Sequence, residues 1–209
     1  LLQSTLRKVQ ARTNPEATNA FTELLLWLYI QQKNYSMAFI QAKALDKRIP
    51  DNEGYNSLRL GKLAKEGAEY STAQKCFEYI IAEYPNGNFG QEAKFEYLST
   101  MYHKTVDGLT IPEEMPGIEA LYLSTIGEFG LSVTTIELTR ELAYLQAYKL
   151  NKPQSALDLL TEASNIKNLP NELRANCKLD LADVMIYKGD IWDAILLYAA
   201  IENENKENP

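Results

Sequence analysis

The segment YSTAQKCFEYIIAEYP, residues 70–85, repeats the pattern of an earlier segment, YSMAFIQAKALDKRIP, residues 35–50. Both segments begin with Tyr-Ser, place Ala at the fourth position and end with Pro. In both, apolar residues follow the Ala after four and seven positions, which is the spacing of one face of an α-helix. The two segments therefore align as amphipathic helices, with residue 70 at the position equivalent to residue 35. This alignment indicates an internal repeat.

Another helical pattern precedes each of these helices, so the predicted repeating unit is a helical hairpin. Pro50 and Pro85 end the first two units, because proline disfavours helical geometry in the residue before it. The predicted hairpins span residues 16–50, 51–85, 88–130, 134–168 and 171–205, and residues 1–12 are predicted to be the remnant of a preceding helix.

The last two predicted hairpins repeat the same helical face. Ala156 and Ala194 are each followed by apolar residues after four and seven positions, and they lie 38 residues apart (194 against 156). Strand-like alternation is not sustained anywhere in the sequence, so the expected fold is all-α.

The third predicted hairpin, residues 88–130, is irregular. Residues 105–117, with two prolines and two glycines, read as an inserted loop. If Ala120 takes the packing role of Ala73, the separation is 47 residues, or one repeat of 35 plus an insertion of 12. Two interpretations of the loop are open: an insertion without a function of its own, or part of a binding surface.

Charge and hydropathy exclude several classes of partner. The net charge is −7 and the pI is about 4.9, so no basic field is expected to attract nucleic acid or an anionic membrane surface. The longest apolar run, Leu24 to Ile30, is far shorter than the roughly 20 residues that cross a bilayer. We therefore expect neither nucleic-acid binding nor insertion into a membrane.

The sequence offers little material for catalysis. His103 is the single histidine, and Cys76 and Cys177 are the only two cysteines, each in a helical pattern that suits a buried free thiol. These residues do not assemble an ordinary zinc site or Cys-His pair, and no glycine-rich phosphate loop is present. We expect no enzymatic activity, no metal and no cofactor.

The residue pattern resembles the tetratricopeptide repeat (TPR) family, which places Leu-Gly in the first helix of each unit and Ala, an aromatic residue and Pro in the second. Matching residues of the second unit are Leu60, Gly61, Tyr70, Ala73, Phe77 and Pro85, and those of the last unit are Gly189, Asp190, Ala194 and Tyr198. The resemblance implies a single repeat domain over residues 1–209. Its architecture would be a right-handed superhelical α-α solenoid of about five hairpins, with first helices on the concave side.

The resemblance also implies which residues line the concave groove. Those positions are Glu23, Trp27, Ile30, Tyr55, Arg59, Lys62, Lys65, Tyr97, Met101, Glu141, Leu145, Tyr148, Asn176, Asp183 and Tyr187. The predicted partner-binding residues among them are Trp27, Tyr55, Arg59, Lys62, Lys65, Tyr97, Tyr148, Asp183 and Tyr187.

Two features of this lining have alternative readings. Some family members hold a terminal carboxylate with Lys, Arg and Asn side chains, but Glu23 and Trp27 stand where a Lys and an Asn would be needed. The stripe of Arg59, Lys62 and Lys65 fits an acidic segment or, equally, a solvated helix face. Four other tyrosines are predicted to be core or turn residues: Tyr35, Tyr70, Tyr84 and Tyr198.

The predicted function is that of a non-enzymatic scaffold that binds a partner peptide or protein on its concave face. The alternative is a structural segment of a longer repeat protein, which stacks on further repeats or self-associates. A groove whose aromatic residues stack on sugar rings is a third option. The chain looks like part of an extended bacterial repeat protein, from which a location in the cell envelope, in the periplasm, is expected.

Overall fold

The structure is a computed structural model that describes Ser4 and residues 15–206. Apart from Ser4, the predicted helix remnant at residues 1–12 lies outside the described part. All regular elements of the described residues are helices, without strands, which confirms the predicted all-α class. The chain divides at Lys104 and Thr105 into two compact units, and each is described by itself.

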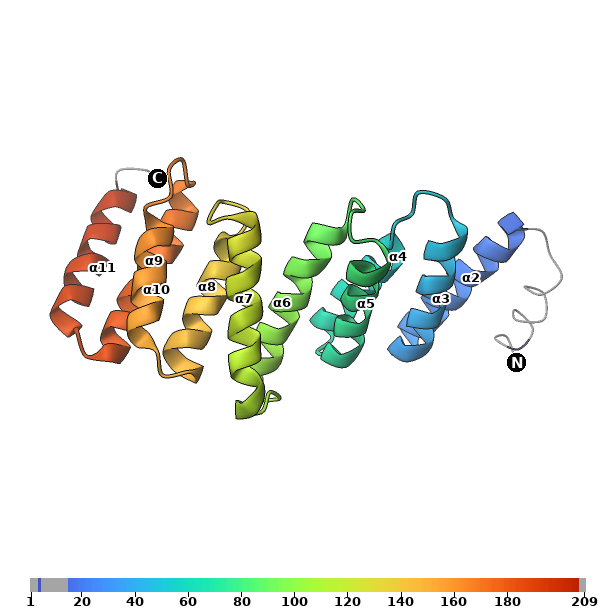
Figure 1. The fold of residues 1–209 in the computed structure, drawn as a ribbon, viewed down its shortest axis with the longest axis horizontal. Coiled ribbons are helices and arrows are strands. Elements are labelled where there is room, and N and C mark those ends of the chain that lie inside the picture. Colours follow the sequence, from blue (N-terminus) through green and yellow to red (C-terminus); the bar gives the residue numbers. More distant parts are fainter. Residues whose placement is uncertain (1–3, 5–14, 207–209) are drawn as a thin grey trace. The chain divides into compact units, whose positions relative to one another are not determined.

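The helices of the first unit pack in consecutive pairs, α2 against α3 and α4 against α5, and α3 also packs against α4 (Figure 1). A third contact joins α6 to the second pair, where Ala93 enters one buried cluster with Ala73 and Phe77. The helices are α2 (Pro15–Gln31), α3 (Tyr35–Arg48), α4 (Tyr55–Glu66), α5 (Tyr70–Glu83) and α6 (Gly90–Val106).

The second unit continues the same pairing. Here α8 runs without a break into the π-helical turn η2, this joined helix packs against α9, α9 against α10, and α10 against α11. The elements are the 3-10 turn η1 (Pro112–Glu114), α7 (Met115–Phe129), α8 (Ile136–Tyr144), η2 (Leu145–Lys149), α9 (Pro153–Ser164), α10 (Asn171–Lys188) and α11 (Ile191–Lys206).

The repeat register read from the sequence is present in the core. Ala38, Ala73, Ala156 and Ala194 are all completely buried. The residues seven positions later are buried as well: Leu45, Ile80, Ala163 and Ile201. The small alanine side chain lets the neighbouring helix approach closely, so the four second helices use one packing face in the same way.

Gly61 sets how closely α4 and α5 pack. A Cβ atom at this position would lie 2.6 Å from Cε1 and 2.7 Å from Cζ of the Phe77 ring. Glycine thus makes room for the aromatic residue of the repeat pattern, sixteen residues later in the sequence (77 against 61).

The predicted loop at residues 105–117 is wrong at both ends. Helix α6 continues to Val106, and α7 already begins at Met115, preceded by the 3-10 turn η1. The register assumed for Ala120 is also wrong, because Ala120 is exposed and the buried face of α7 is formed by Ile118, Glu119 and Tyr122. Helical spacing alone did not distinguish the two faces of α7.

Candidate functional site

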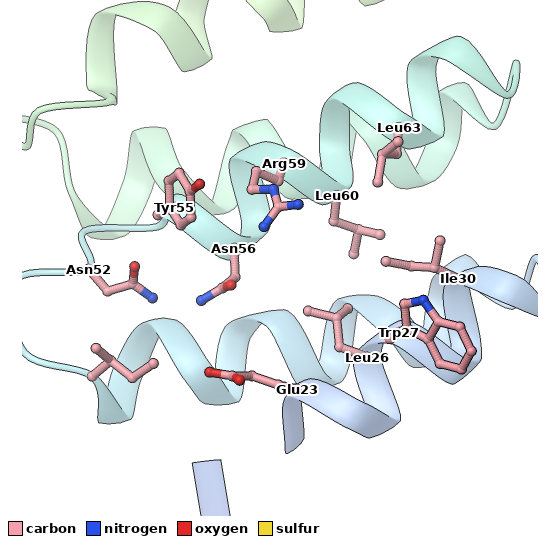
Figure 2. Close-up of a pocket in the computed structure, with 11 residues that line it drawn as sticks. Glu23, Leu26, Trp27, Ile30, Asn52, Tyr55, Asn56, Arg59, Leu60 and Leu63 are labelled. Atoms are coloured by element: carbon pink, nitrogen blue, oxygen red, sulfur yellow. The ribbon is translucent and has the colours of Figure 1, made fainter. Parts of the chain in front are cut away.

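A groove of about 460 Å³ opens between α2 and α4 in the first unit (Figure 2). Both walls come from the first helices of hairpins, together with residues of the connection that precedes α4. The lining residues are Glu23, Leu26, Trp27, Ile30, Ile49, Asn52, Tyr55, Asn56, Arg59, Leu60 and Leu63. Of the fifteen groove positions implied by the family resemblance, Glu23, Trp27, Ile30, Tyr55 and Arg59 meet here.

The groove is largely apolar and its larger side chains are accessible. Leu60 is buried at its base, whereas Trp27 is 54% exposed and Tyr55 is 43% exposed. Leu63, which the sequence analysis did not select, also lines the groove and is 40% exposed. Such accessible aromatic and aliphatic area offers the contact surface that dominates binding energies at protein interfaces.

One cation and one anion stand at this apolar surface. Arg59 and Glu23 are exposed, and neither forms an ion pair with another residue in the described part of the chain. The guanidinium of Arg59 lies over the ring of Tyr55, 5.7 Å from the ring centroid. Both charged groups are therefore available to a ligand without first breaking an internal ion pair.

The other members of the predicted basic stripe, Lys62 and Lys65, form ion pairs within the first unit. Lys62 forms an ion pair with Glu92, and Nζ of Lys65 lies 2.6 Å from a carboxylate oxygen of Glu96. The hydrogen bond to Glu92 and the nearby carboxylate charges raise the pKa of Lys62 despite partial burial. These lysines tie α4 to α6 and are absent from the lining of the groove.

Tyr97 is likewise engaged within the first unit. Its ring packs on the buried cluster around Ala73 and Phe77, and its hydroxyl donates a hydrogen bond of 3.0 Å to Glu78. Burial and this hydrogen bond raise the pKa of Tyr97 to about 12. These contacts indicate that Tyr97 contributes to the packing of the first unit.

The predicted residues of the second unit also gather on one surface. The rings of Tyr148 and Tyr187 meet edge to face with centroids 4.9 Å apart, and the ring of Tyr144 also packs on that of Tyr148, with centroids 4.9 Å apart. Asp183 accepts a hydrogen bond from the hydroxyl of Tyr198. Burial and the negative charge of Asp183 raise the pKa of Tyr148. We call Tyr148, Asp183 and Tyr187 the tyrosine surface.

One expectation for the second unit is wrong. Leu145, placed in the groove by the family register, begins the π-helical turn η2 and is completely buried. Glu141 is half-buried and accepts a hydrogen bond of 2.7 Å from the hydroxyl of Tyr122. Leu145 follows the buried Leu138 and Leu142 at α-helical spacing, so it belongs to the core face of this helix.

The reactive side chains are placed as the sequence suggested. Cys76 and Cys177 are free and buried, and burial raises the pKa of both thiols, that of Cys177 to about 11. His103 is exposed in the last turn of α6. Within residues 15–206, no three His, Cys, Asp or Glu side chains are grouped as a metal site would require. None of the helices in that range is both long and apolar enough to cross a membrane.

Comparison with solved structures identifies the architecture. The chain is similar to a Podosopora anserina protein described as a kinesin light chain with nearly identical TPR-like repeats, at a TM-score of 0.61 and 16% identity. That match covers 93% of this chain and 98% of the other. A variant of the same protein matches with the same TM-score and identity over 94% and 99% of the two chains. No model of a known protein family and no curated protein matches the sequence.

Proposed function

We propose that this chain, whose fold is that of TPR-like repeats, is a non-enzymatic scaffold that binds a peptide segment of a partner protein in the α2–α4 groove. The observation that carries the proposal is the apolar surface of Trp27, Tyr55 and Leu63, accessible beside two charged groups, Glu23 and Arg59. An amphipathic peptide would bury its apolar side chains there and pair its charges with the groove. In TPR proteins, first helices such as α2 and α4 line the concave face.

The tyrosine surface is proposed as a separate protein-binding surface of the second unit. Tyr187 is 52% exposed and packs on Tyr148, so the two rings present a rigid aromatic face beside Asp183. Tyrosine loses little conformational entropy on binding and has a polar hydroxyl, which makes such a face suitable for protein contacts.

The non-enzymatic part of the proposal is supported by the surroundings of the reactive groups. A general base or nucleophile must lie beside a partner group and within reach of substrate. Cys76 and Cys177 are sealed in the core with raised pKa values, and His103 lies in an exposed helical turn away from the groove lining. A protein partner is favoured over nucleic acid because the chain has a net charge of −7.

The test is selection of peptides from a random phage-displayed library on the immobilised chain, followed by calorimetric titration of the best binder. Trp27→Ala should weaken binding by about tenfold or more, as expected for removal of a central aromatic anchor. Ile40→Ala is the control, because Ile40 is an exposed apolar residue of α3 in the same unit and does not line the groove. Equal affinity of Trp27→Ala and wild type for every selected peptide would exclude the groove as the binding site.

A further inference from the structure

Helix α11 is apolar on two opposite sides. One side is buried in the second unit and includes Ala194 and Ile201. The other side carries Trp192, Ile195 and Leu196, which are 81%, 49% and 69% exposed. Together with exposed Ala199, these residues follow the three-and-four spacing of a single helical stripe. We call Trp192, Ile195 and Leu196 the outer face of α11.

The internal repeat shows what the same positions do in the other second helices. Two positions before the core alanine, α3, α5 and α9 carry Ser36, Ser71 and Gln154, where α11 has Trp192. Two positions after it they carry Ile40, Lys75 and Asp158, where α11 has Leu196. All six of these residues are exposed, although another helix packs against each of the three hairpins within its unit.

The comparison shows which kind of neighbour could cover Trp192 and Leu196. A further helical pair stacked in the manner of the other repeats would cover the position of Ile195, whose equivalents Phe39, Gln74 and Leu157 are half-buried or buried. It would leave the positions of Trp192 and Leu196 in solvent. Stacking of repeats therefore does not explain an exposed Trp and Leu where the other helices carry mostly polar residues. A large accessible apolar stripe of this kind marks an interaction surface.

The charges at the edges of the stripe indicate the chemistry of its partner. Asp193 and Glu202 are exposed on α11, on either side of the outer face by helical spacing. Asp193 has no ion pair among the described residues, and the whole chain has a net charge of −7. A partner with basic residues beside its apolar side chains is attracted by this arrangement, whereas a second copy of the chain carries the same excess of negative charge.

We propose that the outer face of α11 binds an amphipathic helix of another protein, whose apolar stripe packs on Trp192, Ile195 and Leu196 and whose lysine or arginine side chains meet the acidic edges. This interaction is independent of the α2–α4 groove, which belongs to the other unit. Packing of an apolar helical stripe on another is a common mode of protein recognition.

The probe is a synthetic helix with leucine on one face and lysine on the other, and its control is the same sequence with glutamate in place of lysine. Trp27→Phe leaves Trp192 as the single tryptophan, so its fluorescence reports occupation of the outer face directly. The lysine helix should shift the emission of Trp192 to shorter wavelength and bind about tenfold or more tightly than the glutamate helix.

Two substitutions with the same change of charge separate this face from general attraction to an acidic protein. Leu196→Lys should weaken binding of the lysine helix by about tenfold. Ile40→Lys alters the equivalent exposed position of α3 and should leave the affinity within about twofold. Equal binding of the two peptides, equal effects of the two substitutions, or no binding at all would overturn the proposal. Sedimentation tests whether a second copy of the chain occupies the outer face. If the wild type sedimented as a dimer and Leu196→Lys as a monomer, the proposal would also be overturned.

Discussion

The carboxylate of Asp46 in α3 accepts a main-chain hydrogen bond of 3.0 Å from the N–H of Ser57 in α4. It also accepts bonds from the Ser57 hydroxyl at 2.6 Å and from the N–H of Asn56 at 2.9 Å. The first N–H groups of a helix have no partner within the helix, and their combined dipole favours a negative charge. Asp46, almost completely buried, thus caps the first helix of the second hairpin from the last turn of the first.

Replacement of Asp46 by alanine should lower the free energy of unfolding by about 2–4 kcal/mol, because the buried donors of Ser57 and the partly buried N–H of Asn56 lose their acceptor. Asp46→Asn should cost less, because the amide oxygen still accepts some of these bonds. Urea denaturation followed by circular dichroism measures both effects. Asp193→Ala, which removes an exposed aspartate, is the control. If Asp46→Ala lost no more unfolding free energy than Asp193→Ala, the capping role would be contradicted.

Gly61→Ala should lower the free energy of unfolding by about 1–3 kcal/mol, because the added methyl group overlaps the Phe77 ring. Gly117→Ala is a matched control in helix α7, where an added Cβ has no neighbour within 4 Å. That substitution should stabilise the helix by about 0.5–1 kcal/mol. Thermal and urea unfolding of the two variants should therefore move in opposite directions, and a shared direction would show that the α4–α5 contact is not the cause.

The repeat could be predicted from the sequence because Ala38, Ala73, Ala156 and Ala194 carry a local signal, the fixed spacing of apolar residues on one helical face. The cap at Asp46 could not, since it joins a carboxylate to a helix that begins nine residues later (55 against 46). No spacing rule within one helix reports such a contact.

The candidate site also contains residues that the repeat spacing predicts and contacts that depend on residues far away in the sequence. Trp27, Tyr55 and Arg59 fall in one groove because first helices use equivalent positions. The partners of Lys62 and Lys65 come from α6, about one repeat later, so the sequence did not distinguish these paired lysines from the unpaired Arg59. Leu63 was missed because the selection favoured aromatic and charged residues, although it lies one turn beyond Arg59 on the same helix.

The pKa of Cys177 predicts a loss of stability in alkaline solution. Burial raises this pKa from 9.0 to about 11, so the folded state keeps the thiol proton that the unfolded state releases. The contribution is complete below pH 9 and is lost as the pH rises through about 11, by about 1–2 kcal/mol over that window. Urea titrations in reducing buffer at about pH 8 and about pH 10.5 should show a smaller fall for Cys177→Ala than for wild type. Equal falls would mean that ionisation of this thiol is not linked to unfolding.

Arg59 and Lys65 should respond differently to loss of charge, although they lie on the same helix. Lys65→Gln breaks a partly buried ion pair with Glu96 and should lower the free energy of unfolding by about 0.5–1.5 kcal/mol, because the glutamate loses its counter-charge. Arg59→Gln removes an exposed cation without an ion pair in the described part and should change stability by less than about 0.5 kcal/mol. Urea denaturation compares the two variants.

Binding should show the reverse order. If the groove holds an amphipathic peptide with an acidic group, Arg59→Gln weakens the titrated affinity while Lys65→Gln leaves it nearly unchanged, because Arg59 lines the groove and Lys65 does not. Salt should reduce the difference between wild type and Arg59→Gln, since an exposed ion pair is screened. If Lys65→Gln weakened binding as much as Arg59→Gln, the groove would not be the whole binding site. The ligand would then lie along the basic stripe of Arg59, Lys62 and Lys65, including the lysines that contact α6.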